Sequence, residues 1–249
     1  MSDVISKEEI TKWLHNDTIP LYVFDEIDST NLFAKSLTED FALVVSNSQS
    51  LGRGRLNRSF YSPKDKGIYM SLKVKVDDLY NRVPFVTTLC AVAVHEAIEK
   101  LFSRGSAIKW VNDIYIGRKK VAGILCEACD ASHAVIGIGI NFYPASLPED
   151  LEHIATHLTN SRAEFSRSDL ICEICTNILN LINKLPDTSF MEYYKANSCV
   201  LGKEVLCVQG DSSFLAVATG IDECGGLIVE TCEGTKTLSS GEVTIRFTD

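Results

Sequence analysis

The stretch AIKWVNDIYIGRKKVAGILCEACDASHAVIGIGIN, residues 107–141, decides the fold class of this chain. Its three strand-like runs are residues 107–116, 121–127 and 134–141. Because only short connections separate these runs, they predict hairpins and an antiparallel or mixed sheet. A tight turn at Gly117-Arg118 would bring the polar residues of 109–113 close to Lys120. We therefore expect a sheet with polar side chains gathered near this turn.

The remainder of the first two hundred residues alternates between helical and strand patterns. Further expected elements are strands at 21–27, 41–46 and 68–76, helices at about 7–16, 29–37, 84–102, 166–185 and 190–196, and loops at 48–61 and 142–160. Pro84 suits the first turn of its helix, and Ser166 suits the cap of another. Apolar and polar residues alternate along 68–76, which predicts a strand with one buried face.

After Ser198 the expected elements are all short strands, with no further helix. Short strands are expected at 204–207, 214–221, 227–231, 235–238 and 243–247. Evenly spaced short strands separated by turn residues favour a small β-barrel or sandwich. We therefore expect an α+β protein with two domains, residues 1–198 and 199–249.

Composition limits the classes of function. The 249 residues carry a formal net charge of −9, from 33 acidic and 24 basic side chains. Such a chain repels phosphate on average, so we expect no nucleic-acid or membrane partner, and any phosphate site must be built locally. The sequence shows no secretory signal and no apolar run of membrane-spanning length, which predicts a cytoplasmic protein.

Nine cysteines are present, and in the cytoplasm they are expected to be reduced thiols. Cys126 and Cys129 form one Cys-x-x-Cys pair, and Cys172 and Cys175 form another. The gap between the pairs is far longer than in zinc ribbons, and the second pair has helical i, i+3 spacing among isoleucines. We therefore favour buried thiols over a zinc site.

Two charged segments are candidates for phosphate chemistry. Gly52-Arg53-Gly54-Arg55, followed by Arg58, has the glycines and forked donors of an anion-binding loop, although it is no Walker A motif. Asp113 carries an oxygen ligand suited to magnesium, and Lys120 stands beside an apolar run. Taken singly, a solvated basic turn and a hairpin end with solvated charges explain these segments equally well.

Two further segments are candidates for ligand contact. Gly137-Ile138-Gly139-Ile140-Asn141 places glycines inside an apolar strand, where a ligand or another backbone can approach closely. It lacks the third glycine and the helix of a dinucleotide fingerprint, and a bulge or packing contact is the alternative. The segment Asp28-Ser29-Thr30-Asn31 is typical of a helix N-cap, which is its default interpretation. The positive N-terminal end of a helix can also hold a polar ligand.

Together and in this order, these segments resemble the catalytic domain of biotin protein ligases. The resemblance rests on Asp28 to Asn31, Gln49 with Gly52 to Arg55, Lys109 to Asp113, Lys120 to Leu125, and Gly137 to Asn141. Gly241-Glu242-Val243 with Arg246 also looks like the end of the family's small β-domain, so the match spans roughly residues 20–249. Five ordered motifs are far more specific than any one of them.

The resemblance implies a fold and a reaction. The fold is a class II synthetase-like mixed sheet with flanking helices, followed by an SH3-like β-barrel. The reaction is the ATP- and Mg²⁺-dependent activation of biotin to biotinyl-5′-AMP, followed by transfer of the biotinyl group to a lysine of a biotin carboxyl carrier protein. No tightly bound prosthetic group and no covalent enzyme intermediate are expected. A homodimer paired through sheet edges is possible in such a family.

The resemblance also assigns roles by position. Lys120, Arg53 and Arg55 are the expected catalytic residues. The expected biotin-binding residues are Ser29, Thr30, Asn31, Gln49, Gly52, Arg53, Lys120, Gly123, Leu125, Gly137 and Gly139. The expected nucleotide-binding residues are Arg55, Arg58, Phe60, Asn112, Asp113, Asn141 and Arg246, with Asp113 as the magnesium ligand. Closure of the loop at 50–61 is expected to protect the adenylate from water, so this loop should be mobile without ligand.

The sequence departs from the family pattern in two places. Phe60 stands where the family often has Trp, and Val111 stands where it has Pro. A Phe ring can still stack, so ATP binding should be altered and not lost. The change at Val111 affects only local rigidity.

Three alternative functions remain open. A lipoate protein ligase shares the fold and the adenylation chemistry, but its arginine- and glycine-rich motif with a following His-Asp is not found. A biotin-dependent repressor needs an N-terminal winged helix, and only 27 residues precede Asp28. A biotin-binding protein without catalysis would have no need of Lys120, Asp113 and the arginine loop.

Overall fold

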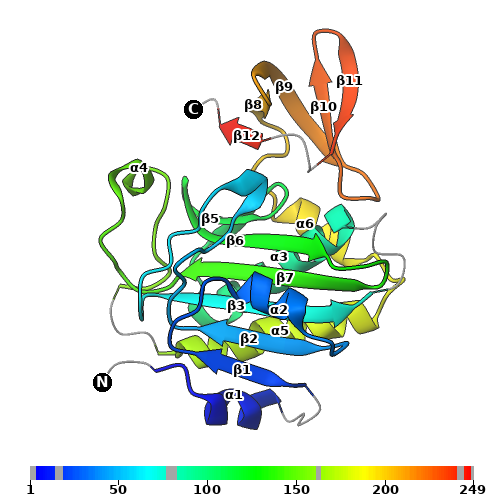
Figure 1. The fold of residues 1–249 in the computed structure, drawn as a ribbon. Coiled ribbons are helices and arrows are strands. Elements are labelled where there is room, and N and C mark those ends of the chain that lie inside the picture. The colour runs from blue at the N-terminus through cyan, green and yellow to red at the C-terminus, as the bar shows by residue number, and fades with distance from the viewer. Residues whose placement is uncertain (1–3, 15–18, 77–82, 161–163, 240–243, 248–249) are drawn as a thin grey trace.

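The computed structural model describes residues 4–14, 19–76, 83–160, 164–239 and 244–247 (Figure 1). The larger sheet has seven strands in the order β1-β2-β3-β7-β6-β5-β4. Their bounds are β1 (Leu21–Phe24), β2 (Ala42–Ser46), β3 (Gly67–Lys75), β4 (Ser106–Lys109), β5 (Asp113–Ile116), β6 (Lys119–Ala128) and β7 (His133–Asn141). Strands β1 and β2 are parallel and the other pairs antiparallel, so the expected mixed sheet is confirmed.

Helices flank both faces of this sheet. Their bounds are α1 (Lys7–Leu14), α2 (Thr30–Ser36), α3 (Val83–Phe102), α4 (Glu149–Glu152), α5 (Arg167–Asn183) and α6 (Phe190–Ala196), with a 3-10 turn η1 (Arg55–Asn57). Helix α2 lies on one face, against β2, β3 and β7, while α3 and α5 cover the other face (Figure 1). Ser166 caps α5, as its sequence predicts, and the structure adds that it forms a capping box with Asp169.

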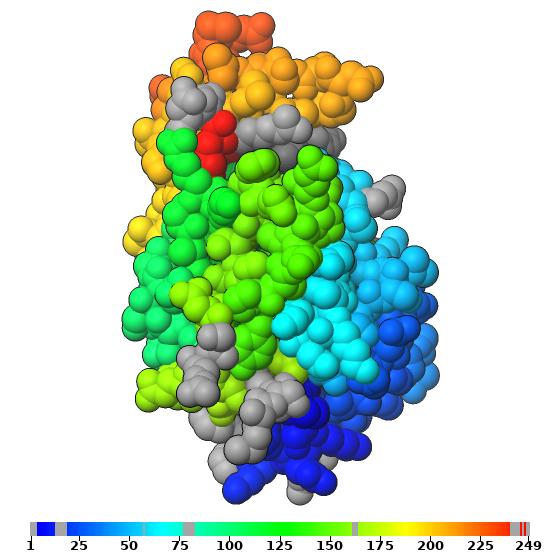
Figure 2. Space-filling model, turned by 90° about the vertical axis from the view of Figure 1, so that its left-hand side faces the viewer, coloured from blue at the N-terminus to red at the C-terminus, as the bar shows by residue number. Residues whose placement is uncertain are grey.

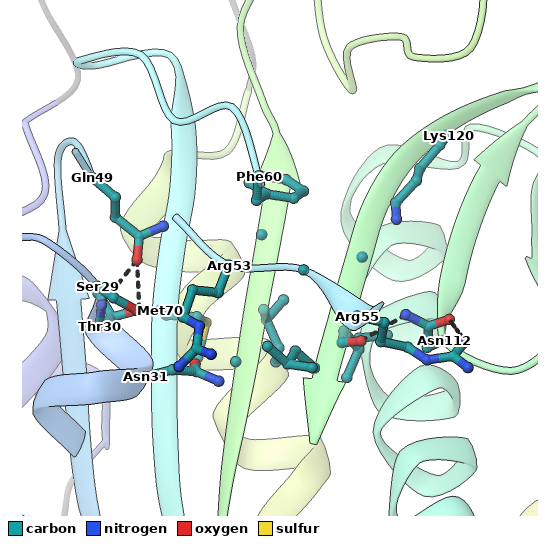
Figure 3. A pocket seen from close by; sticks show the side chains of 17 residues that line it. Ser29, Thr30, Asn31, Gln49, Arg53, Arg55, Phe60, Met70, Asn112 and Lys120 are labelled. Atoms are coloured by element: carbon teal, nitrogen blue, oxygen red, sulfur yellow. Dashed lines mark hydrogen bonds between the residues drawn. The ribbon is translucent and has the colours of Figure 1, made fainter. Parts of the chain in front are cut away.

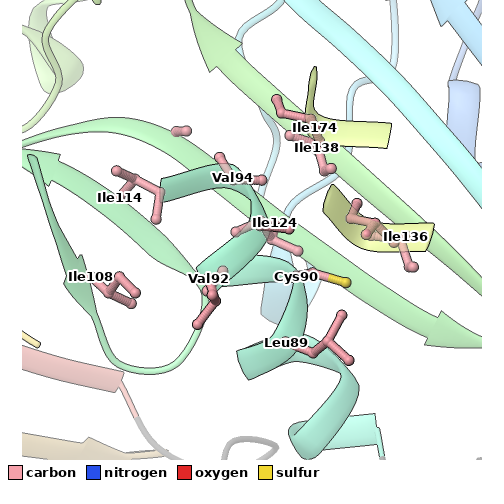
Figure 4. Packing of buried hydrophobic residues seen from close by; sticks show 14 of the residues in the cluster. Leu89, Cys90, Val92, Val94, Ile108, Ile114, Ile124, Ile136, Ile138 and Ile174 are labelled. Atoms are coloured by element: carbon pink, nitrogen blue, oxygen red, sulfur yellow. The ribbon is translucent and has the colours of Figure 1, made fainter. Parts of the chain in front are cut away.

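The main core lies between the sheet and the α3–α5 layer. Leu89, Cys90 and Val94 of α3 pack towards isoleucines of β6 and β7 (Figure 4). Each such Leu, Ile or Val side chain, fully buried, contributes about 1.5–3 kcal/mol through the hydrophobic effect. On β7 the period of two sends Ile136 and Ile138 into this core and turns the intervening Gly137 towards α2.

Two expectations about strands need correction. The run 107–116 is not one strand, because the chain reverses at Trp110-Val111-Asn112 and Lys109 pairs with Asp113. The turn is buried and not solvated: the Trp110 indole donates to the Gly225 carbonyl at 2.9 Å. Strand β3 is buried on both faces and not on one, because α2 covers its polar side.

The C-terminal strands form a second, antiparallel sheet beyond the β5–β6 end of the first (Figure 1). They are β8 (Glu204–Gln209), β9 (Ser212–Ile221), β10 (Leu227–Thr231), β11 (Gly234–Leu238) and β12 (Thr244–Phe247), in the order β11-β10-β9-β8-β12. Within the described residues β11 and β12 are not paired, so the sheet is open and the expected barrel closure is not seen. The domain boundary near Ser198 remains a prediction.

Two further sequence expectations concern cysteines and membranes. Cys172 and Cys175 are buried in α5, as their spacing predicts, and burial raises the pKa of Cys172 to about 12. Burial likewise raises the pKa of Cys126 on β6 to about 12, which makes both thiols poor nucleophiles. Across the ranges that the structure covers, none of the helices is long and apolar enough to cross a membrane.

Candidate active site

Two adjoining pockets lie where the loop 50–61 crosses the α2 face of the large sheet. The α2 pocket is lined by Ser29, Thr30, Asn31, Gln49, Arg53, Gly54, Arg55, Phe60, Met70, Asn112, Lys120, Gly123, Ile124, Leu125, Gly137, Ile138 and Gly139 (Figure 3). The α4 pocket is lined by residues 54–56, 58–61, 109, 110, 112, 113, 115, 118, 120, 141, 147, 151, 154, 155, 245 and 247. Gly54, Arg55, Phe60, Asn112 and Lys120 line both, so these five residues mark the junction.

Helix α2 begins at a polar end of the α2 pocket. Ser29 is its cap, so Thr30 and Asn31 stand in the first turn, where both are buried against the sheet. The Gln49 side-chain oxygen accepts from the Thr30 amide at 2.9 Å, and the Gln49 side-chain nitrogen donates to the Ser62 hydroxyl at 3.1 Å. These amide and hydroxyl groups suit a ligand that carries both donors and acceptors.

Three glycines of β6 and β7 leave room for side chains that border the α2 pocket. A Cβ on Gly137 would overlap the Asn31 side-chain amide. A Cβ on Gly139 would lie 2.5 Å from the Phe60 ring, and one on Gly123 would lie 2.7 Å from the Lys120 Nζ. Gly137 and Gly139 thus leave room for side chains from other segments, whereas at Gly123 the atom in the way is the flexible end of Lys120 on the same strand.

The loop 50–61 folds back on itself above the pocket. The Phe60 amide donates to the Gly52 carbonyl at 2.8 Å, and the Gly54 amide donates to the Arg58 carbonyl at 2.7 Å. Gly52 is buried in this fold and lies outside the lining of both pockets, where a Cβ would collide with the Phe60 carbonyl. The absence of a side chain at Gly52 thus lets the two loop segments approach, and the expected contact of Gly52 with biotin stays a prediction.

Arg55 is held at the junction by Asn112. The Arg55 Nη1 donates to the Asn112 Oδ1 at 2.9 Å, and the Asn112 Nδ2 donates to the Ile124 carbonyl at 2.7 Å. Within the described residues the buried Nη2 of Arg55 has no hydrogen-bond partner, so it is available to a ligand. Burial lowers the pKa of Arg55, against the charge of Asp113, but a guanidinium stays protonated in proteins.

Lys120 reaches the same junction from β6. Its Nζ lies 2.6 Å from the Asp113 Oδ1, and both side chains are partly exposed. Its backbone pairs with the segment after α4: the Lys120 amide donates to the Ile154 carbonyl at 2.8 Å and its carbonyl accepts from Thr156 at 2.9 Å. Main chain and side chain are thus fixed separately, which orients the ammonium group.

The α4 pocket lies on the far side of this junction. In Figure 2 the yellow-green segment around α4 lies beside the cyan segment that follows the loop, and the Tyr61 hydroxyl donates to the Ser146 carbonyl at 3.3 Å. Leu147, Leu151 and Ile154 give this pocket an apolar wall. Phe247 of the small sheet also lines the α4 pocket, and the centroid of its ring lies 4.8 Å from the Lys109 Nζ.

Asp113 is the only acidic residue among the described residues that line the α4 pocket. No cluster of three or more His, Cys, Asp or Glu that could hold a metal occurs in the part of the chain that the structure describes. One carboxylate combined with substrate phosphates is a common way to hold Mg²⁺. Asp113 therefore fits a magnesium ion that arrives with a nucleotide.

The structure brings together nearly all the predicted site residues. Apart from Gly52, every expected biotin residue lines the α2 pocket, and Arg58, Asp113 and Asn141 line the α4 pocket. The Arg246 side chain lies outside the described residues. Sequence reasoning missed the apolar α4 wall, and it missed Ser71 and Glu127, which lie behind the pocket and bind Asn31.

Known proteins share both parts of this architecture. The profile of the Biotin/lipoate A/B protein ligase family matches residues 23–141, and that of the Biotin protein ligase C terminal domain matches residues 200–246. The chain is 31% identical to the bifunctional ligase/repressor BirA of Bacillus subtilis, over 96% of this chain and 78% of that protein. It is 27% identical to the biotin–[acetyl-CoA-carboxylase] ligase of Mycobacterium tuberculosis, over 82% and 79%.

A solved structure agrees in three dimensions. The biotin protein ligase from Aquifex aeolicus, in complex with biotin and ATP, superposes with a TM-score of 0.81 at 27% identity, covering 92% of this chain and 99% of that chain. The two matched families follow one another along the chain in the order of the two sheets. The chain therefore belongs to the biotin protein ligase family and is an ATP-dependent biotin ligase.

Proposed function

We propose that this ligase forms biotinyl-5′-AMP at the junction of its two pockets and then passes the biotinyl group to a lysine of a biotin carboxyl carrier protein. The observation that carries the proposal is the junction itself. Lys120 and Arg55 line both pockets, so both cations face the place where ligands of the two pockets would meet. The Aquifex structure that superposes on this chain holds biotin and ATP together, which supports two adjoining ligand sites.

Biotin would enter the α2 pocket with its ureido ring at the α2 end. Ser29, Thr30 and Gln49 would meet the ring's donors and acceptors, and the glycine-lined slot would take the valerate chain. The carboxylate would then reach Arg55 and Lys120. ATP would occupy the α4 pocket, with its base against the apolar α4 wall and its phosphates near Arg55, Arg58 and Lys120.

The first step joins two anions. A biotin carboxylate oxygen attacks the α-phosphorus, the bond from this phosphorus to the bridging oxygen of the β-phosphate breaks, and pyrophosphate leaves with that electron pair. Lys120 and Arg55 reduce the repulsion between the anions and stabilise the charge that grows on the phosphoryl oxygens. Asn112 keeps Arg55 in place for this.

The second step needs no covalent link to the protein. A neutral lysine amine of the acceptor attacks the biotinyl carbonyl, the bond from this carbon to the phosphate oxygen breaks, AMP leaves with that electron pair, and the nitrogen loses one proton to water. Asp113 would release Lys120 to the phosphates and hold Mg²⁺, which shields phosphate charge when bound.

Leu56 and Ile154 are exposed at the rim of the α4 pocket, where an acceptor would approach.

Pyrophosphate release tests this assignment. Purified protein would receive ATP and Mg²⁺ with biotin or lipoate, and Lys120→Ala would be compared with Lys119→Ala, whose exposed ammonium contacts the Glu152 carbonyl. Biotin-dependent release that falls about 100-fold or more only in Lys120→Ala supports the proposal. Release with lipoate alone would assign the lipoate reaction instead, and equal rates in both variants would remove Lys120 from the mechanism.

The acceptor is tested separately, by transfer of labelled biotin to an isolated carboxyl carrier domain and to the same domain without its target lysine.

Cytoplasmic location, the absence of a nucleic-acid partner and a homodimer stay predictions.

A further inference from the structure

One arginine of the α4 pocket has no part in the adenylation proposed above. Arg118 follows Gly117, whose φ of 58° forms the turn between β5 and β6. Arg118 lines the α4 pocket and not the α2 pocket, so it lies beyond the junction as seen from the proposed biotin slot. It also stands outside the five motifs on which the family resemblance rests.

The next two residues show how Arg118 is placed. Lys120 lines the same pocket, whereas Lys119 does not and donates to the Glu152 carbonyl at 2.7 Å. Two residues of chain span at most about 7 Å, which is within reach of one arginine side chain. If Lys120 meets the α-phosphate of ATP, the Arg118 guanidinium can therefore reach the phosphates that follow it.

Arg118 differs from the cations of the junction in having no partner. Arg55 is held by Asn112, and Lys120 contacts Asp113. In the ranges that the structure describes, no hydrogen bond or ion pair holds the Arg118 side chain, and the residue is exposed. Its guanidinium thus keeps all five donors for an anion that enters the pocket.

The direction of the proposed reaction brings such an anion to Arg118. The biotin carboxylate attacks the α-phosphorus from the α2 side, and in an in-line displacement the pyrophosphate leaves on the opposite side. Arg118 lies on that side, while Lys120 and Arg55 stay at the junction, where the α-phosphate remains. The leaving group is highly charged, so a further cation at this end of the pocket has phosphate charge to neutralise.

Resting on the proposed adenylation, we propose that Arg118 binds the β- and γ-phosphates of ATP and the pyrophosphate that forms from them. It touches neither the α-phosphate nor the base, so it acts only on ligands that carry the outer phosphates. Because this contact is the same before and after the bond to the α-phosphorus breaks, it lowers the KM for ATP without changing the kcat.

Arg118→Gln removes the charge and keeps most of the length of the side chain. At saturating biotin we expect the KM for ATP and the inhibition constant of pyrophosphate to rise about five- to tenfold, the effect of one charge-assisted contact at an exposed site. The kcat, and the inhibition constant of AMP, which has only the α-phosphate, should change less than about twofold. Arg118→Lys keeps the charge, so each constant should stay within about threefold of wild type.

Turnover of the full-length chain is followed with hydroxylamine, which captures the adenylate as labelled biotin hydroxamate, so no acceptor protein is needed. Lys119→Gln is the matched control, because it removes the same charge from the adjacent residue, which does not line the pocket. A general loss of positive charge near the nucleotide would affect both variants alike, whereas a direct contact affects only Arg118→Gln.

Higher constants for ATP and pyrophosphate but not for AMP, in Arg118→Gln and not in Lys119→Gln, support the inference. An equal rise for AMP would move Arg118 to the α-phosphate or the base, and unchanged constants, or equal rises in the control, would make it an ordinary surface charge. Each of these results overturns the inference. A wild type that forms no hydroxamate from biotin refutes the proposed function itself, a result that no comparison of Arg118 variants can produce.

Discussion

Gly137→Ala places a single methyl group at the most crowded point of the proposed biotin slot. The new Cβ would overlap the Asn31 side-chain amide. Strand β7 cannot move away, because Gly137 is paired with Ser71 of β3 on one side and with Leu125 of β6 on the other. The Asn31 amide must therefore leave its place.

The cost follows from the bonds that hold this amide. It loses the hydrogen bond from Ser71 at 2.6 Å and the one to the carboxylate of Glu127 at 3.0 Å. A neutral bond contributes about 1 kcal/mol and one to a charged group about 1.5–3 kcal/mol, so the free energy of unfolding should fall by about 2–4 kcal/mol. Biotin should bind at least about tenfold more weakly, because the displaced amide enters the slot and one ligand contact is lost.

Calorimetry with biotin and thermal unfolding would measure both effects. Gly220→Ala is the matched control, since its Cβ would find the nearest atom, the Ile228 Cδ1, at an ordinary 3.4 Å in the C-terminal sheet. Gly137→Ala should lower the unfolding midpoint by about 5–10 °C and the control by almost nothing. A Gly137→Ala protein that unfolds and binds biotin like wild type would show that the slot is not closed by Asn31.

Three other perturbations follow from the same contacts. Asn112→Ala frees Arg55 and leaves the Ile124 carbonyl unpaired, so the KM for ATP should rise about tenfold in steady-state assays, and an unchanged KM would contradict the role of Asn112. Hydrogen bonds that the His133 ring donates to the Asp40 and Asp130 carboxylates raise the pKa of His133 above 6.5, and partial burial opposes them. The stabilisation by protonated His133 is therefore complete below pH 6.5 and is lost as pH rises through the raised pKa. The unfolding midpoint of wild type should therefore fall with rising pH relative to His133→Gln, and parallel curves would contradict this. Biotin with ATP should protect residues 50–61 from proteolysis, and equal cleavage rates with and without ligand would argue against loop closure.

Much of the large domain could be predicted from local patterns. The alternation of glycine and isoleucine in Gly137-Ile138-Gly139-Ile140 predicts a strand with two different faces, and the structure sends isoleucines to the core and glycines to the pocket. Pro84 and Ser166 predict the starts of α3 and α5 because their backbone preferences are local.

What could not be predicted depends on contacts between distant segments. The reversal at Trp110-Val111-Asn112 is stabilised by Gly225, more than a hundred residues away, so its sequence resembles a continuous strand. Ser71 and Glu127 carry ordinary strand positions in the sequence, and only the packing of α2 on the sheet brings them to Asn31. The apolar α4 wall consists of Leu147, Leu151 and Ile154, in and beside a helix of four residues, and no local pattern shows that these side chains face the loop 50–61.

Charge explains why Arg55 and Lys120, two cations of the α4 pocket, each have a partner that fixes them. The chain carries a net charge of −9, yet Arg55, Arg58, Arg118 and Lys120 converge on one pocket that contains a single carboxylate among its described lining residues. Cations that face each other repel, so each needs its own fixing: Asn112 for Arg55, and Asp113 with the backbone after α4 for Lys120. A triphosphate would relieve this repulsion on binding, and the energy that the fold stores in holding the cations together would then appear as affinity for ATP. The partners of the cations are therefore as much a part of the site as the cations themselves.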